Sequence, residues 1–215
     1  MNKKYIGVHR EGWKFFIIFF SISIFSFFVT KFLFVIFVIL TFFTLWFFRD
    51  PERFSKSEDN QLLSAADGKI CFIGHENPPQ ETEINETMKK VSIFMNVFNV
   101  HVNRSPVQGS IEHVVYKKGK FLNASLDKAS DKNERSSLVL NTQNGTKIIV
   151  VQIAGLIARR ILSFISSNEQ LDQGERFGLI RFGSRVDIYM PLDAIEKCKV
   201  GDRVVAGESI LASLK

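Results

Sequence analysis

The chain is organised around the stretch Arg181-Phe182-Gly183-Ser184-Arg185-Val186-Asp187-Ile188-Tyr189-Met190-Pro191, in which a Gly-Ser pair leads into a strand that stops at proline. Glycine has no Cβ to block close approach, and it permits backbone angles that other residues avoid. The hydroxyl of Ser184 can therefore be held against the carbonyl carbon of Gly183, which suits attack by a serine on its own backbone. Taken alone, the dipeptide also fits an ordinary turn before a buried strand.

The first fifty residues differ in composition from the rest. The chain has 215 residues, enough for one domain and an appendage, and 14 of its 22 phenylalanines fall between Phe15 and Phe48. We predict a membrane-attaching segment over residues 1–50, with its apolar part at 15–48, followed by a globular domain over residues 51–215. The predicted joint is Arg49-Asp50-Pro51-Glu52-Arg53, because its proline ends any helix that arrives from the apolar segment.

Lys31 divides the apolar segment into runs of 16 and 17 residues, Phe15–Thr30 and Phe32–Phe48. A helix needs about 20 residues to cross a bilayer core of about 30 Å, so each run spans only marginally. Two short helices would form a hairpin with Lys31 at the turn and both basic flanks on the cytoplasmic side. Alternatively, one helix spans and Lys31 snorkels. We favour the hairpin, and we therefore predict that the protein lies at the cytoplasmic face of the cell membrane.

The net charge of the chain indicates which kinds of partner it can bind. The formal net charge is +6 and the isoelectric point is near 9.3, which suits an anionic surface such as phospholipid head groups or nucleic acid. The apolar N-terminus favours an anionic membrane, and we expect no nucleic-acid partner. Cys71 and Cys198 show no CxxC or Cys/His spacing, and the sequence contains no metal-binding motif. We therefore predict neither a disulfide framework nor a metal site.

From Leu62 onward, short β-branched or period-two runs alternate with Gly, Pro and Asn, which predicts a mainly β (α+β) fold with antiparallel strands. Asn144-Gly145 is a hairpin turn signal, and Ala158–Ile165 predicts a short helix. Val200–Glu208 is similar to the strand-turn-strand element of biotinyl and lipoyl carrier folds, so we expect a barrel-sandwich-like element, although it lacks the apical lysine of a carrier. The predicted strands are Lys69–Gly74, Val91–Phe94, Gly109–Tyr116, Ser137–Asn141, Lys147–Ile153, Arg185–Tyr189 and Arg203–Ala206.

A longer segment around the Gly-Ser pair carries a family resemblance. The cleavage site of the phosphatidylserine decarboxylase proenzymes, in their short bacterial and archaeal branch, resembles Phe177-Gly178-Leu179-Ile180-Arg181-Phe182-Gly183-Ser184-Arg185-Val186-Asp187. Further motifs of that family reappear in order at Ala66-Asp67-Gly68, Val100-His101-Val102-Asn103-Arg104-Ser105-Pro106 and Val151-Gln152-Ile153-Ala154-Gly155. The resemblance covers about residues 47–215, and it implies a lyase that converts phosphatidylserine to phosphatidylethanolamine and carbon dioxide.

The resemblance also implies that the chain cleaves itself between Gly183 and Ser184. Attack by the serine hydroxyl moves the acyl group from nitrogen to oxygen. Elimination then leaves residue 184 as dehydroalanine, which hydrolyses to a pyruvoyl group and ammonia. This covalent pyruvoyl cofactor forms a Schiff base with the substrate amine and accepts the electrons left when carbon dioxide departs. Chains 1–183 and 184–215 are expected to stay associated as strands of one sheet.

His101 corresponds to the family histidine assigned to decarboxylation, although a lone histidine in this context is more often structural. Asp67 corresponds to the aspartate that assists self-cleavage in the longer bacterial branch, although Asp67-Gly68 is otherwise a simple turn. That branch has a second histidine where this chain has Arg104, and arginine cannot act as a general base at neutral pH. Either another group activates Ser184, or His101 serves both steps while Arg104 binds phosphate or stabilises an oxyanion.

Several questions stay open at the level of sequence. Lys117–Arg135 is either a solvated loop or a loop that covers the substrate. The rival function is a noncatalytic, membrane-tethered lipid-binding module that retains Ser184 uncut. An archaeal-type serine lipid would need the same chemistry as phosphatidylserine, and homo-oligomerisation is left open. The absence of a G-x-S-x-G elbow argues against a serine hydrolase. Four arginines are unranked candidates for binding the phosphate or carboxylate of the head group: Arg185, Arg159, Arg160 and Arg181.

Overall fold

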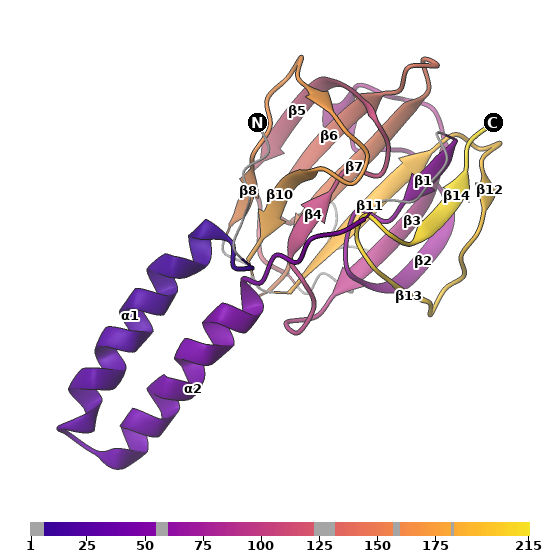
Figure 1. Ribbon diagram of the computed structural model, residues 1–215. Helices are drawn as coiled ribbons and strands as arrows, with labels where there is room; N and C mark the ends of the chain where they lie inside the picture. Colours follow the sequence, from indigo (N-terminus) through magenta and orange to yellow (C-terminus); the bar gives the residue numbers. More distant parts are fainter. Residues whose placement is uncertain (1–6, 55–59, 123–131, 157–159, 182) are drawn as a thin grey trace. The chain divides into compact units, whose positions relative to one another are not determined.

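The computed structural model describes residues 7–54, 60–122, 132–156, 160–181 and 183–215. The chain divides into two compact units, Met1–Glu52 and Arg53–Lys215, and each is described by itself (Figure 1). This division falls inside the stretch Arg49–Arg53 that the sequence indicated as the joint.

The N-terminal unit is a pair of antiparallel helices, α1 (Arg10–Phe27) and α2 (Lys31–Phe47). The chain turns at residues 28–30, where the Thr30 hydroxyl caps α2 by accepting a hydrogen bond from the Leu33 amide at 3.2 Å. At the other end of the hairpin, a Cβ on Gly12 would lie 2.5 Å from the Cβ of Phe48. Glycine therefore lets the start of α1 approach the end of α2.

This turn decides between the two geometries predicted for the apolar segment. It separates two helices and places Lys31 at the start of α2, as the hairpin interpretation predicted, and the alternative of one continuous helix is wrong. Neither helix, nor any other helical stretch in the described part of the chain, combines the length and the apolar character needed to cross a bilayer. The spanning segment predicted from the sequence is therefore not found.

The second unit is built on a curled, eight-stranded antiparallel sheet (Figure 1). Its order is β13 (Arg203–Val204), β2 (Gly68–Glu76), β3 (Met88–Met95), β11 (Ser184–Met190), β7 (Lys147–Ala154), β6 (Arg135–Asn141), β5 (Gly109–Lys117) and β9 (Gln170–Leu171). The mainly antiparallel β prediction is confirmed. The hairpin turn at Asn144-Gly145 is confirmed as well, because β6 pairs with β7 and Gly145 adopts φ +76°.

Two three-stranded sheets and a single 3-10 turn, η1 (Gln80–Thr82), complete the described part of this unit. One sheet has the order β4 (Val102–Arg104), β10 (Arg176–Ile180) and β8 (Ile161–Ser163). The other has the order β1 (Gln61–Leu63), β14 (Ile210–Ser213) and β12 (Ile195–Glu196). The barrel-sandwich-like element stays a prediction: Val200–Glu208 supplies β13 and a turn with Gly207 at φ +74°.

The short helix predicted over Ala158–Ile165 is wrong. Residues 157–159 lie outside the described part of the chain, and residues 161–163 form strand β8, paired with β10. Ile161 is buried in the core beside this pairing. Its apolar neighbours fit a helix or a strand equally in so short a run, and the open edge of β10 selects the strand.

The central strand β11 is enclosed on every side. It pairs with β3 along one edge and with β7 along the other. Val186, Ile188 and Met190 are fully buried in the main hydrophobic core, whereas Tyr189 joins a second cluster on the opposite face. The strand stops before Pro191, as predicted. Its first residue, Ser184, is therefore held by a rigid frame.

Candidate active site

Ser184 is the first residue of β11 and lies directly opposite Met95 of β3 on one side and Ala154 of β7 on the other. Its side chain is fully buried and points into the interior, where Oγ donates a hydrogen bond to the Met95 sulfur at 3.4 Å. A thioether sulfur is a weak acceptor. The hydroxyl is therefore kept out of water and is not committed to a strong hydrogen bond.

Gly183 adopts a left-handed conformation, with φ +57°. A Cβ at this position would meet no heavy atom within 4 Å. The sequence offered two reasons for a glycine at position 183, close approach of other atoms and an unusual backbone conformation. The structure supports only the second, because the positive φ favours glycine whereas no crowding requires it. The left-handed residue turns the chain sharply immediately before the strand, at the peptide bond that the sequence marks for cleavage.

A pair of buried amides, which sequence reasoning missed, continues the polar path inward from Ser184. Asn103 of β4 approaches the Met95 sulfur with Nδ2 at 3.7 Å, and Gln152 of β7 donates from Nε2 to the Asn103 Oδ1 at 2.8 Å. Both side chains are almost fully buried. A Cβ on Gly178 would lie 2.7 Å from the Gln152 Nε2, so this glycine makes room for the amide.

The signal for this pair was present in the sequence. Asn103 and Gln152 each lie inside one of the motifs quoted for the family, and Gln152 interrupts an apolar run in β7. A buried amide side chain needs partners for both its oxygen and its nitrogen. The partner of Gln152, Asn103, comes from another sheet, β4-β10-β8, which the sequence did not reveal.

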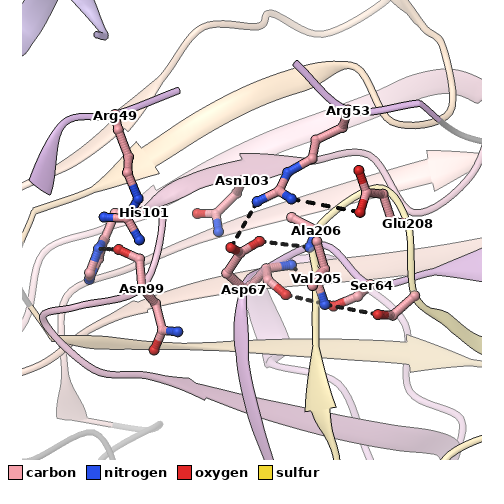
Figure 2. A network of polar contacts seen from close by, with 12 residues as sticks. Arg49, Arg53, Ser64, Asp67, Asn99, His101, Asn103, Val205, Ala206 and Glu208 are labelled. Atoms are coloured by element: carbon pink, nitrogen blue, oxygen red, sulfur yellow. Dashed lines mark hydrogen bonds and ion pairs between the residues drawn. The ribbon is translucent and has the colours of Figure 1, made fainter. Parts of the chain in front are cut away.

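Asp67 immediately precedes β2, at the same end of the sheet as Ser184, because Lys69 lies opposite Phe94, the neighbour of Met95. Figure 2 shows its carboxylate held between two donors: Oδ1 accepts from the Ala206 amide at 2.8 Å, and Oδ2 accepts from the Arg53 Nη2 at 3.0 Å. Arg53 also lies 3.7 Å from the Glu208 carboxylate. The side chain of Asp67 is thus fixed as an ion-paired carboxylate.

His101 is fully buried just before β4. Its Nδ1 lies 2.9 Å from the carbonyl oxygen of Asn99. Because a carbonyl oxygen only accepts, Nδ1 of His101 carries a hydrogen. The His101 carbonyl in turn accepts from the Ile180 amide at 3.3 Å, which ties the histidine to the strand that leads to the Gly-Ser pair.

Two arginines proposed as head-group ligands are held by protein atoms. Arg104 is buried, and its Nη1 donates to the carbonyl of Gly174 at 2.9 Å. Arg185 points to the face of β11 opposite Ser184, where its Nη2 donates to the Asp187 Oδ2 at 2.9 Å and its Nε lies 2.8 Å from Oδ1. Burial alone would lower the pKa of Arg185, but the charge and hydrogen bond of Asp187 outweigh it and raise that pKa.

The remaining arginine candidates divide similarly. Arg159 lies outside the described residues, as do residues 123–131 of the predicted loop Lys117–Arg135. Arg160 is exposed, and its carbonyl accepts from the Arg181 amide at 3.2 Å. Within the same loop, Asn133 donates from Nδ2 to the carbonyls of Ala154 and Leu122, each at 2.8 Å. Asn133 thereby connects the loop to the strand partner of Ser184.

The geometry gathers a buried serine after a left-handed glycine, a buried histidine, a fixed carboxylate and two buried amides at one end of a sheet. The family model for phosphatidylserine decarboxylase matches residues 40–212, which is most of the chain. The chain belongs to the phosphatidylserine decarboxylase family. This decarboxylase is therefore an enzyme of the conversion of phosphatidylserine to phosphatidylethanolamine, and phosphatidylserine is its substrate. The rival interpretation as a noncatalytic lipid-binding module is not supported.

The matched range agrees with the extent of the resemblance, about residues 47–215, inferred from motifs. It begins inside α2, so α1 of this decarboxylase lies outside it. It includes each candidate site residue: Ser184, Gly183, His101, Asp67, Arg104 and Arg185. Their individual roles remain predictions.

Proposed function

We propose that the protein is a self-processing phosphatidylserine decarboxylase that converts Ser184 into a covalent pyruvoyl group and works at the cytoplasmic face of the cell membrane. One observation carries the proposal: a glycine in the left-handed conformation directly precedes a serine whose hydroxyl is buried and only weakly bonded. A serine with a purely structural role would instead be expected to make a strong hydrogen bond in so dry a place.

The cleavage reaction uses atoms of the chain and one water. The Ser184 Oγ adds to the Gly183 carbonyl carbon and the C–N bond breaks, so the hydroxyl proton ends on the new amine. Removal of the Cα proton of residue 184 then expels the Gly183 carboxylate and leaves dehydroalanine. Its imine tautomer takes up one water, which yields the pyruvoyl group and ammonia.

Residues around Ser184 fit both the precursor and the product. Met95 and Ala154 flank the position with uncharged side chains, and the amide pair supplies hydrogen-bonding groups without a net charge. When present, the pyruvoyl group supplies a carbonyl that draws electrons from the substrate as carbon dioxide leaves. Ser184 is fully buried, so bulk water would have little access to that carbonyl.

We further propose that His101 transfers protons in both steps, self-cleavage and decarboxylation. Asn99 orients the His101 ring through Nδ1, and an imidazole can both accept and donate a proton. Asp67 keeps the turn before β2 in place through Ala206 and Arg53. We further propose that Arg104, which stays protonated, contributes positive charge and does not act as a base.

The helical hairpin is proposed as the membrane attachment. Its turn region exposes large apolar side chains, including Phe25, Phe28 and Phe32, of which Phe28 is 80% exposed. Trp13 and Trp46 lie toward the other end of the hairpin, where amphipathic rings suit the head-group level. Basic residues near them, among them Lys14 and Arg49, suit an anionic leaflet.

Mass spectrometry of the purified protein tests the proposal directly. Wild type is expected as two chains, 1–183 and 184–215, the second with a ketone in place of its amino terminus. Ser184→Ala is expected as one chain without decarboxylase activity. Ser166→Ala, at an exposed serine, is the matched control and should be cleaved normally. A wild-type chain that is continuous through residues 183 and 184 and still releases carbon dioxide would contradict the proposal.

A further inference from the structure

The end of the sheet that carries Ser184 exposes three large apolar side chains on neighbouring segments. Phe98 follows β3 and is 63% exposed, Leu156 follows β7 and is 69% exposed, and Leu122 is 39% exposed. The strands β3 and β7 are those that pair with β11, so Phe98 and Leu156 follow the two partners of Ser184, Met95 and Ala154. We call these three residues the apolar rim.

The rim is held outward by hydrogen bonds. Asn96 accepts from the Phe98 amide at 2.9 Å, and Asn99 accepts from the Asn96 amide at 2.9 Å, so the Phe98 turn is braced from both sides. Asn99 also holds His101 in the interior. Leu122 is fixed by Asn133, which accepts from its amide at 2.9 Å and binds the Ala154 carbonyl. Exposure of Phe98 and Leu122 is therefore a property of ordered turns.

Cationic side chains accompany the rim. Lys120 and Lys132 are exposed beside Leu122, where the Lys120 amide donates to the Lys132 carbonyl, and Arg160 is exposed at the start of β8. Among the described residues of the loop Lys117–Arg135, the acidic one, Glu134, is buried and bonded to the Tyr116 hydroxyl. Burial and the hydrogen bond to Glu134 raise the pKa of Tyr116 to about 12. The outward charge of the described residues here is positive.

We propose that the apolar rim inserts into the surface of an anionic bilayer, so that Ser184 faces the head group of a phosphatidylserine molecule that stays in its leaflet. The inference rests on the proposed function. Drawing a lipid fully into water costs about 0.8 kcal/mol for each methylene group exposed, which is prohibitive for two long chains. Inserting Phe98, Leu122 and Leu156 avoids that cost, and the adjacent lysines and arginine match the anionic surface.

A matched pair of double variants tests the rim. Phe98→Ser/Leu156→Ser removes two rim side chains, and Leu192→Ser/Ile195→Ser removes two apolar side chains of 51% exposure each that follow the other end of β11. Each variant is assayed on phosphatidylserine in phosphatidylcholine vesicles and on dicaproyl phosphatidylserine as a soluble monomer. The rim variant is expected to lower the ratio of vesicle rate to monomer rate about tenfold, and the control to leave it unchanged. An unchanged ratio in the rim variant would overturn the inference.

A fluorescent probe locates the rim independently of activity. In a background of Trp13→Phe/Trp46→Phe, tryptophan is placed at position 98 or, as the control, at position 192. Vesicles that contain phosphatidylserine and brominated phosphatidylcholine are expected to quench the probe at 98 and to leave the probe at 192 unquenched. Absence of quenching at 98 while the protein is bound to the vesicles would overturn the inference and would indicate a protein contact at this surface.

The two proposals can fail separately. An uncleaved wild-type chain, or no carbon dioxide from the soluble monomer, contradicts the proposed function whatever the rim does. A cleaved enzyme that turns over the monomer, with a vesicle rate indifferent to Phe98 and Leu156, contradicts the rim alone.

Discussion

The two faces of β11 bury polar groups in different ways. On the inner face, Ser184 bonds to the Met95 sulfur, which Asn103 also approaches, and Gln152 bonds to Asn103, so that this chain of contacts is uncharged. On the outer face, Arg185 and Asp187 are equally buried but fully charged, and Lys90 lies 3.7 Å from the Asp187 carboxylate and 2.6 Å from Glu76. Adjacent residues of one strand thus enter two electrostatic environments.

The charged residues on one face of β11 and the uncharged residues on the other suit two different tasks, holding the strand in place and leaving the serine hydroxyl able to react. Buried ions keep their places only when paired, and each pair fixes the geometry of its neighbours. A reacting serine needs freedom to change its bonding, which a strong ion pair would prevent. The outer face thereby anchors the strand, while the inner face leaves the hydroxyl available.

Breaking the outer face should have the largest effect. Asp187→Ala leaves Arg185 buried without its carboxylate, so we expect the free energy of unfolding to fall by about 3–5 kcal/mol in urea denaturation. The double variant Arg185→Met/Asp187→Leu removes both charges and should recover most of that stability. If the double variant is stable but binds phosphatidylserine poorly, Arg185 has the head-group role predicted from the sequence; if it remains as unstable as the single variant, the ion pair is not the cause.

Breaking the inner face should cost less stability. Asn103→Ala leaves the Gln152 amide without its acceptor, a loss of about 1–3 kcal/mol. Asn103→Leu/Gln152→Leu removes both amides and should be closer to wild type in stability. We expect both variants to cleave more slowly in a time course followed by denaturing gel, because the amides position Met95 and Ser184. Normal cleavage in the double variant would show that the amides are structural only.

Two glycines allow the role of backbone conformation in cleavage to be tested separately from its effect on stability. Gly183 and Gly145 both have positive φ, and a Cβ on either meets nothing within 4 Å. Alanine at either position should therefore cost about 1–2 kcal/mol of unfolding free energy through the same strain. Cleavage should slow only in Gly183→Ala, since Gly145 lies in the turn between β6 and β7. Equal cleavage rates in the two variants would contradict a special role for the conformation of residue 183.

The smallest expected effect is on the pH dependence of stability, through the carboxyl group of Glu81. Burial would raise the pKa of Glu81, but hydrogen bonds from Arg135, its own backbone amide and Ser137, together with the charge of Arg135, lower it below its ordinary value. A carboxyl with a lowered pKa in the folded state adds stability above the unfolded pKa, and that contribution is lost as pH falls through the folded one. Glu81→Gln should therefore lower the unfolding free energy by about 1 kcal/mol at pH 7 and less at pH 4, measured in urea. A difference that grows in acid would contradict this.

Sequence reasoning located much of this fold from local patterns. The runs that became β2, β3, β5, β6, β7, β11 and β13 were predicted, and all of these strands except the two-residue β13 are long enough to show their period. The strands β1, β4, β8, β9, β10, β12 and β14 were not, because two to five residues carry too little pattern and their pairing partners are distant in the chain. The error over Ala158–Ile165 has this cause.

In the candidate site, too, the residues that depend on local sequence were predicted and those that depend on distant contacts were missed. Gly183 and Ser184 were found from the dipeptide and its motif, since their chemistry is local. The amide pair was missed because Asn103 and Gln152 are 49 positions apart and meet only when β4 packs near β7. The opposite placement of Ser184 and Arg185 could be expected from strand alternation, but the partner Asp187 could not be chosen from sequence alone.

By itself, the sequence determined the family, the Gly-Ser pair at the start of a strand, the antiparallel strands and the division at residues 49–53, because each depends on residues that are close along the chain. The tertiary structure alone decided which groups surround Ser184, which face receives the charges and which apolar side chains stay exposed at that end. Those outcomes depend on strand register and on contacts between sheets, and neither is encoded in any short stretch of residues.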